Sequence, residues 1–510
     1  MSATQILRNL VVRVDGDRYT ISGQFEWEVI IAQDDAPDQA HREVDRMGQV
    51  LKREVYSVIL EQADQQIADQ WLVANRGLQK RGRRPYPFVT CFGTVPVRRT
   101  RVSDSRENTW AVPSAVVWNT PQRKYIVPAV RQAAVDQMRQ SSARKVRRRL
   151  SEEAYEDKLL GVSTIVKIVH AEGEQLIEAQ RERALKVLKE HPETIARGLA
   201  SWPVDEVPRK NADEEETALP ADEQQEALER AVGFLNRTSQ TGDAKPGRSS
   251  NASDESNGDV SSRSATYVPR RVDPGWVIVQ PDEVKTKAQA SEPGKQNWTY
   301  TATVQVEEQT YYLAEASAAG LLRLIGSLSC ILKVVEGTRR LMVIGDGAKW
   351  IRNWFHELNL PDREMILCWF HLADRLYQRL SAGGFAKARR ESLEQEVLSH
   401  LWHGDLTGAI WVLWDIRSEA RNPKWITDMI RYLLYRRAYL PDYSARHEAG
   451  LWIASNRVEK WNDWAVSNRC KRRGMSWTSD GVLSLATHEA AEKNDELLSW
   501  RAKHELAQSA

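Results

Sequence analysis

The sequence predicts an α/β protein: a mixed-sheet domain with an all-α insertion, preceded by a mainly helical, basic region. Three observations predict this class. Strand-like and helix-like patterns succeed one another between residues 276 and 369, residues 372–450 show helical periodicity only, and basic residues gather before residue 150. At 510 residues the chain is too long for one core, so we expect several domains.

The amino-acid composition limits the classes of protein to which this chain can belong. Hydrophobic residues make up 41% and charged residues 28%, as in soluble globular chains. The sequence has no apolar run of about 18 residues and no charged-then-apolar leader, so we expect neither a membrane span nor a signal peptide. The cysteines Cys91, Cys330, Cys368 and Cys470 lie far apart. We therefore expect neither a disulfide framework nor a cysteine-rich zinc site. The same cysteine usage predicts a cytoplasmic location.

The net charge of +2 averages over strong segregation. Residues 76–101 contain eight basic residues and no acidic one, and residues 122–149 contain nine basic residues against Asp136 alone. Such blocks favour a polyanionic partner, although a single block can also be a solvated helix face. Two successive blocks make nucleic acid the better interpretation.

The amino-terminal elements are two strand pairs around a long helix. Residues 10–31 alternate apolar and polar about Asp15-Gly16-Asp17, which predicts a hairpin. Residues 36–75 have apolar side chains at helical spacing and no internal proline beyond residue 39, which predicts one long helix. Residues 87–102 predict a second strand pair that turns near Gly93. We group residues 1–120 as one region.

Residues 121–206 predict a helix-turn-helix domain. A helix over 127–140 precedes a second one capped by Ser141 or Ser142, and Ser163 caps a third after a turn at 159–163. Small three-helix units also occur as plain packing modules. The neighbouring basic cluster favours DNA binding by Arg144, Lys145, Arg147, Arg148 and Arg149, with Thr164, Lys167 and His170 facing the major groove.

The composition shifts sharply at residues 207–267, and residues 238–264 consist largely of Ser, Gly, Asn, Asp, Arg and Lys, which predicts a disordered linker apart from a short helix at 226–236. Strands then follow at 276–281, 298–306, 310–314, 340–344 and 364–369, with helices at 316–335 and 349–358. This order is that of a ribonuclease H-like domain, with a mixed sheet. The predicted limits are 268–371 and 451–510 for the catalytic domain and 372–450 for the insertion.

Three acidic residues lie at the predicted ends of strands or at the start of a helix. Asp282 ends the first strand, Asp346 follows the fourth before Gly347, and Glu459 begins a helix. Acids at the ends of neighbouring strands can converge at one edge of the sheet. Their oxygen atoms are ligands that suit Mg or Mn, and two such ions can support the displacement reaction at a phosphodiester. Separately, each acid is also compatible with a turn, a strand-end cap or a helix-start acid.

Residues 345–351, 366–372 and 455–459 resemble insertion-sequence transposases of the DDE class, most closely the Kra-type group, with a broader likeness to Mutator-like elements. The resemblance implies that Asp282, Asp346 and Glu459 are the metal-binding catalytic triad. It matches Cys368 and His371 to the family's Cys-x-x-His signature, where we expect a structural or supporting role. Residues 468–477 match its basic Gly-Met-x-Trp segment, with DNA-binding candidates Lys471, Arg472 and Arg473.

The resemblance implies a transposase that binds the terminal inverted repeats of its element. It would cut and join DNA with Mg or Mn, and act as a homodimer or higher oligomer on DNA. Two alternatives remain open: a transposase-derived DNA-binding protein without catalysis, and a ribonuclease H-like nuclease that cuts without joining.

Overall fold

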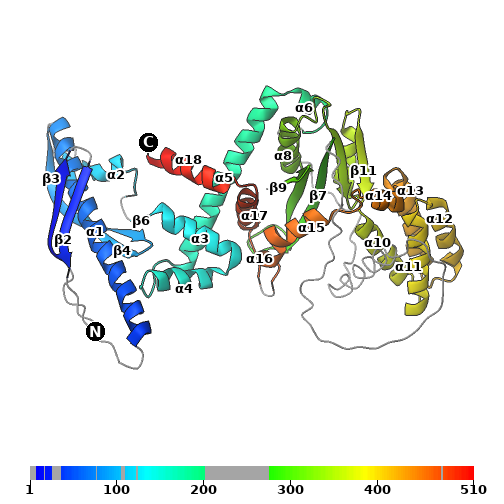
Figure 1. The fold of residues 1–510 in the computed structure, drawn as a ribbon, viewed down its shortest axis with the longest axis horizontal. Helices are drawn as coiled ribbons and strands as arrows, with labels where there is room; N and C mark the ends of the chain where they lie inside the picture. Colours follow the sequence, from blue (N-terminus) through cyan, green and yellow to red (C-terminus); the bar gives the residue numbers. More distant parts are fainter. Residues whose placement is uncertain are drawn as a thin grey trace. The chain divides into compact units, whose positions relative to one another are not determined.

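A computed structural model of the chain describes residues 7–15, 18–25, 36–75, 77–104, 109–121, 124–200, 275–472 and 475–509. These residues form a mixed α/β protein with sheets of four and five strands, a two-stranded hairpin and many helices (Figure 1). Within this described part, no helix is long and apolar enough to cross a membrane. Contacts divide the chain into two units, Met1–Leu176 with Asp495–Ala510, and Ile177–Asn494.

The first unit starts with the predicted hairpin and long helix. Strands β1 (Leu7–Asp15) and β2 (Arg18–Phe25) pair antiparallel, and α1 (Ala36–Ala74) follows. Strands β3 (Leu78–Thr90) and β4 (Gly93–Asp104) pair antiparallel, so the predicted turn before Gly93 is confirmed and the strands are longer than predicted. Two short strands complete the sheet in the order β5-β4-β3-β6: β5 (Thr109–Ala111) and β6 (Tyr125–Ile126).

A polar network joins α1 to this sheet. Asp64 is fully buried and accepts hydrogen bonds from the backbone N–H and hydroxyl of Thr100, both at 2.7 Å, and from the Ser114 hydroxyl. Arg99, also fully buried, donates to Ser114 Oγ and lies over the Tyr86 ring. Burial lowers the pKa of Arg99, whose Nη1 and Nη2 are buried without a hydrogen-bond partner in the described residues and lie among the rings of Tyr86, Phe88 and Trp118. The predicted basic strand is therefore partly a core element.

Three helices follow: α3 (Pro128–Gln140), α4 (Ala143–Glu153) and α5 (Val162–Glu190). Ser142 caps α4 by accepting from the Lys145 N–H, as predicted. Ser163 does not cap α5; the helix begins one residue earlier and the Ile165 N–H bonds to the Gly161 carbonyl. At 29 residues, α5 also runs well past the predicted stretch, into the second unit.

The second unit is built on a mixed sheet of order β11-β10-β7-β8-β9. Strand β7 pairs in parallel with β10 and antiparallel with β8, while β10–β11 is parallel and β8–β9 antiparallel. The strands are β7 (Trp276–Lys287), β8 (Gln296–Val306), β9 (Gln309–Glu315), β10 (Arg340–Gly345) and β11 (Arg363–Leu367). Helix α8 (Ala318–Ile331) packs on β8 and β9, and α9 (Lys349–Glu357) connects β10 to β11.

Two predicted strand limits are wrong. The strand predicted to end at Asp282 continues to Lys287, because its second half pairs with β8 as far as Gln296. The strand predicted to reach Trp369 ends at Leu367, and Trp369 already belongs to the next helix. The predicted linker at 207–267 and its short helix lie outside the described residues.

The all-α character predicted for residues 372–450 is confirmed. Its helices gather in one group, yellow to orange in Figure 1: α10 (Trp369–Ala382), α11 (Lys387–Trp402), α12 (Leu406–Asp415), α13 (Pro423–Tyr435) and α14 (Tyr443–Glu448). Trp369 is fully buried against Trp402 and Tyr443, with ring centroids 4.9 Å away in both cases. The chain then forms α15 (Asn456–Asn462), a π-helical turn η5 (Asp463–Ser467), α16 (Asn468–Cys470), α17 (Ser479–Lys493) and α18 (Leu497–Ser509).

Candidate metal and DNA-binding sites

Asp346 lies where the sequence predicts, directly after β10. Its Oδ1 accepts a hydrogen bond from the Ala348 N–H at 2.8 Å, which closes the turn into α9. Gly347 makes this turn at a φ of +76°, a conformation that side chains with a Cβ rarely adopt. The carboxylate is thereby directed by the backbone that follows it.

Asp282 lies within β7, beside the end of β10. The two strands run parallel with Val343 opposite Val279 as their last pair, and Asp346 and Asp282 each lie three residues further along in the same direction. Asp282 Oδ1 accepts from the Glu283 N–H at 2.8 Å, and Oδ2 accepts from Asn462 Nδ2 at 2.6 Å. Asp282 is thus a mid-strand residue that meets a helix from the carboxy-terminal part of the chain.

Glu459 lies on α15, which is fastened to β7. Gln280 Oε1 accepts from the N–H groups of Arg457 and Val458, both at 3.2 Å, and its Nε2 donates to the Ala454 carbonyl at 3.4 Å. These bonds satisfy backbone groups that a helix start leaves unpaired. Since Gln280 precedes Asp282 by two residues, the start of the helix carrying Glu459 is held beside the first acid.

The acids affect one another's protonation. Burial raises the pKa of Asp282 to about 7, and the carboxylates of Asp346 and Glu459 add to the rise. The pKa of Glu283 is also raised to about 7, by burial and then by Asp346 and Asp282. Carboxylates that crowd a poorly solvated place favour protonation or a bound cation. This donor set, oxygen ligands with excess negative charge, fits Mg²⁺ or Mn²⁺.

Cys368 and His371 lie against Glu459. Cys368 is the residue before α10, fully buried, and its Sγ accepts the Ser455 N–H at 3.3 Å. His371 Nδ1 lies 3.8 Å from Glu459 Oε1. Burial alone would lower the pKa of His371, but the neighbouring Cys368, Glu459 and Asp346 raise it well above its ordinary value. Donor atoms of Cys368, His371 and Glu459 all lie within 4.8 Å of one another, a group that does not include Asp282 or Asp346.

The helical insertion reaches back to the Asp346 turn. The Tyr432 hydroxyl donates to the Asp346 carbonyl at 3.5 Å, and Arg436 Nη2 donates to the Gly347 carbonyl at 3.2 Å. The Arg436 guanidinium is buried and lies 3.8 Å from the centre of the Tyr432 ring. Sequence reasoning missed Tyr432, Arg436, Asn462 and Gln280, because no spacing rule links them to acids so far away in the chain.

One predicted DNA-binding residue of the basic segment lies near the acids. Burial lowers the pKa of Lys471, whereas Asp463 and Asp282 act to raise it, so its ammonium group is within electrostatic reach of the first acid. Arg472 is exposed and donates to the Asn468 carbonyl at 2.7 Å. The prediction for Arg473 falls outside the described residues.

The other predicted DNA-binding residues lie in the first unit. Arg144, Lys145, Arg147, Arg148 and Arg149 are all exposed on α4, whereas Val146 and Leu150 of the same helix are buried. The basic residues thus form the outer face of an amphipathic helix. Only modest pairing is seen within it, as between Arg148 and Glu152 at 3.5 Å.

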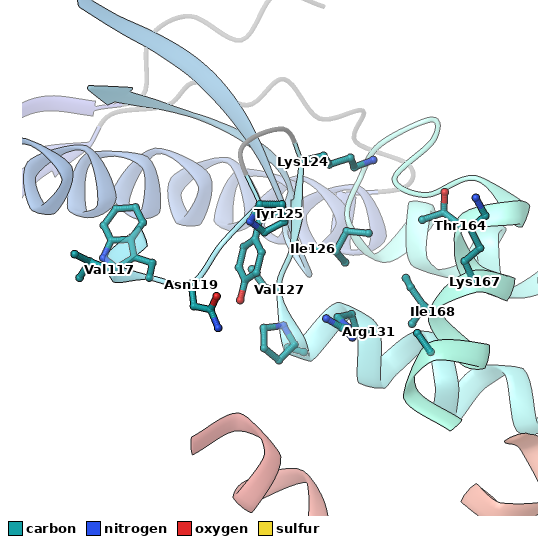
Figure 2. Close-up of a pocket in the computed structure, with 15 residues that line it drawn as sticks. Val117, Asn119, Lys124, Tyr125, Ile126, Val127, Arg131, Thr164, Lys167 and Ile168 are labelled. Carbon is teal, nitrogen blue, oxygen red and sulfur yellow. The ribbon is translucent and has the colours of Figure 1, made fainter. Parts of the chain in front are cut away.

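Thr164 and Lys167 line a cavity of about 970 Å³. Figure 2 shows them on α5, across the cavity from Asn119 and Tyr125, with Arg131 of α3 lower down. The wall also carries Lys124, next to the sheet. His170, predicted to share the groove-facing side, is half-buried and does not line this cavity.

No protein-family model matches this chain, and no curated protein is significantly similar to it. Function is therefore inferred from the exposed basic face of α4, from Lys471 near the acids, and from the acids that β7, β10 and α15 bring together.

Proposed function

We propose that the protein is a DDE transposase with a ribonuclease H-like catalytic domain. It would bind the terminal inverted repeats of an insertion sequence and catalyse metal-dependent strand cleavage and strand transfer. The sheet order β11-β10-β7-β8-β9, with β7 central and antiparallel strands on one side only, supports this fold assignment. The transposase-like residues 345–351, 366–372 and 455–459 support the class.

The observation that carries the proposal is the electrostatic coupling of three acids that are remote in sequence. Asp282 is contributed by a central strand, Asp346 by the end of its parallel neighbour, and Glu459 by a helix bonded to the central strand through Gln280. Both Asp346 and Glu459 raise the pKa of Asp282. A purely structural role would give no reason to gather like charges in a half-buried place.

When bound, Mg²⁺ or Mn²⁺ would activate the attacking oxygen and stabilise the leaving oxygen of a phosphodiester displacement. Asp282 and Asp346 would hold the ions and Glu459 would complete their ligands. Asn462 fixes the Asp282 carboxylate, and Lys471 is placed to contact a phosphate near it. Water attacks the strand first and frees a 3′ hydroxyl, and that hydroxyl then attacks the target strand, releasing a new 3′ end there.

Recognition of the element ends is assigned to the first unit. Helices α3, α4 and α5 would act as the helix-turn-helix, with α5 presenting Thr164 and Lys167 to DNA. The exposed basic face of α4 would bind phosphates, which supplies affinity without reading sequence. The protein would thus act at the chromosome, and pairing of two ends would require a dimer or higher oligomer.

The test is cleavage of DNA carrying the element's own flanking ends, with and without Mg²⁺, by wild type and Asp346→Asn. Asparagine retains the Oδ1 acceptor for Ala348 but removes the charge, so the turn should persist while cleavage falls by at least about 1,000-fold. Asp362→Asn, in an exposed loop of the same unit, is the matched control and should cut normally.

Each outcome separates the alternatives. Equal cleavage by wild type and Asp346→Asn would remove the triad assignment. Specific end binding without cleavage by either protein would favour a DNA-binding protein that has lost catalysis. Nicked products that never join to a target, when precut ends are supplied, would favour a nuclease.

A further inference from the structure

A second donor group overlaps the candidate magnesium site and has different chemistry. It consists of Cys368 Sγ, His371 and Glu459, whose donor atoms lie within 4.8 Å of one another. Sulfur and imidazole ligands suit borderline and soft ions such as Zn²⁺, whereas Mg²⁺ selects oxygen. The group is therefore not simply part of the three-carboxylate site.

The distances suit a single small ion. Tetrahedral bonds of about 2.0–2.1 Å from nitrogen and oxygen place those two atoms about 3.4 Å apart. His371 Nδ1 and Glu459 Oε1 are 3.8 Å apart, so a shift of a few tenths of an ångström brings both onto one ion. His371 Nδ1 is buried and has no hydrogen-bond partner within the described part of the chain, so an ion that binds there would displace only a proton from the ring.

One residue orients two of the three donors. The Ser455 N–H donates to Cys368 Sγ at 3.3 Å, and the Ser455 hydroxyl donates to Glu459 Oε1, also at 3.3 Å. Hydrogen bonds of this kind fix the direction of metal ligands. Cys368 is further held by its N–H, which bonds to the Gly345 carbonyl at 2.8 Å. The donors are thus pre-arranged rather than gathered by chance.

We propose that Cys368, His371 and Glu459 form a Zn²⁺ site with three protein ligands and one open position. Because Glu459 also belongs to the proposed magnesium site, Zn²⁺ and Mg²⁺ would compete for it. Only this competition rests on the proposed transposase function; the zinc site itself does not.

Another group of donor atoms, away from the proposed zinc site, provides the matched control. His191, Glu193 and Cys330 also bring donor atoms within 4.8 Å of one another in the same unit. There His191 Nδ1 is already 3.0 Å from Glu193 Oε1, and both side chains are about half exposed. Substituting Cys330 therefore removes a comparable thiol without touching the proposed site.

The experiment titrates the metal-free full-length protein with Co²⁺ and records the near-ultraviolet sulfur-to-cobalt absorption. Wild type should bind one thiolate-ligated Co²⁺ that Zn²⁺ displaces. Cys368→Ser should lose the band, and His371→Gln, a half-exposed position where misfolding is less of a concern, should weaken Co²⁺ binding at least about 10-fold. Cys330→Ser and Cys91→Ser should retain the band, and circular dichroism checks the fold of each variant.

A band that is absent from wild type, or lost in Cys330→Ser but kept in Cys368→Ser, would overturn the proposal. Asp346→Asn should bind Co²⁺ like wild type while cutting no DNA. If the protein shows the thiolate band but never cuts DNA, the zinc site would stand and the transposase assignment would be wrong. In a protein that does cut, Zn²⁺ should raise the Mg²⁺ requirement of wild type but not of Cys368→Ser.

Discussion

Asn462 donates a hydrogen bond from Nδ2 to Asp282 Oδ2 over 2.6 Å, while its Oδ1 accepts the Thr301 hydroxyl at 2.5 Å. Asn462 lies one turn after Glu459 on α15 and is buried. One short helix therefore carries the third acid and also orients the first. Thr301 lies opposite Asp282 on β8, so the chain of hydrogen bonds closes on the neighbouring strand.

Asn462→Ala should slow DNA cleavage by about 10–100-fold, the usual effect of losing a residue that orients a metal ligand. Asp282 would lose a donor while its buried charge remains. The measurement is the cleavage rate as a function of Mg²⁺ concentration. Asn353→Ala, exposed on α9, is the control and should match wild type. An Asn462→Ala enzyme with unchanged rate and Mg²⁺ dependence would show that this hydrogen bond does not serve catalysis.

Gly347→Ala should destabilise the second unit more than Gly294→Ala does. Both glycines have positive φ, +76° and +105°, so both substitutions strain the backbone by about 1–2 kcal/mol. At residue 347 the added methyl would also lie 2.9 Å from Arg436 Nε and Leu367 Cδ1, whereas at 294 it meets nothing within 4 Å. Urea unfolding measures the difference, and equal losses of stability would mean that Arg436 moves aside freely.

Asp282→Asn should stabilise the metal-free protein at pH 8 but not at pH 4. The ordinary pKa of 3.8 rises to about 7 in the folded state, so between these values the folded protein retains a proton that the unfolded chain releases. Folding stability therefore falls as pH rises through this window, by on the order of 2–4 kcal/mol. Melting temperatures in EDTA at both pH values test it. An Asp282→Asn advantage that does not grow with pH would refute the assignment of this charge.

The double variant Arg144→Ala/Arg147→Ala should weaken DNA binding with little effect on stability, since both side chains are exposed. If each contacts one phosphate, the slope of log affinity against log salt should shrink by about two. Fluorescence anisotropy over a salt series measures it. Lys189→Ala, exposed in the last turn of α5, should bind like wild type. A salt slope unchanged in the double variant would remove α4 from the DNA interface.

The sequence predicted elements where local pattern decides structure. The long helix at 36–75, the pairing about Gly93 and the acid after β10 all follow from periodicity or turn chemistry, and all are observed. Predictions from the sequence were wrong where contacts with distant parts of the chain set the limits of an element. Strand β7 continues past Asp282 because β8 pairs with it, and α5 begins before Ser163. The contacts of Tyr432 and Arg436 with the Asp346 turn join residues 86 and 89 positions apart, which no local rule predicts.

Through the three hydrogen bonds of Gln280, the helix carrying Glu459 takes its position in part from the strand carrying Asp282, and the bond from the Ser455 N–H to Cys368 Sγ adds a second attachment. The parts of the stretch between β11 and α15 that contact neither the Asp346 turn nor Cys368 can then differ in length without displacing the last acid. A fold assembled in this way can acquire a new surface module between two of the candidate site residues and keep their side chains in place.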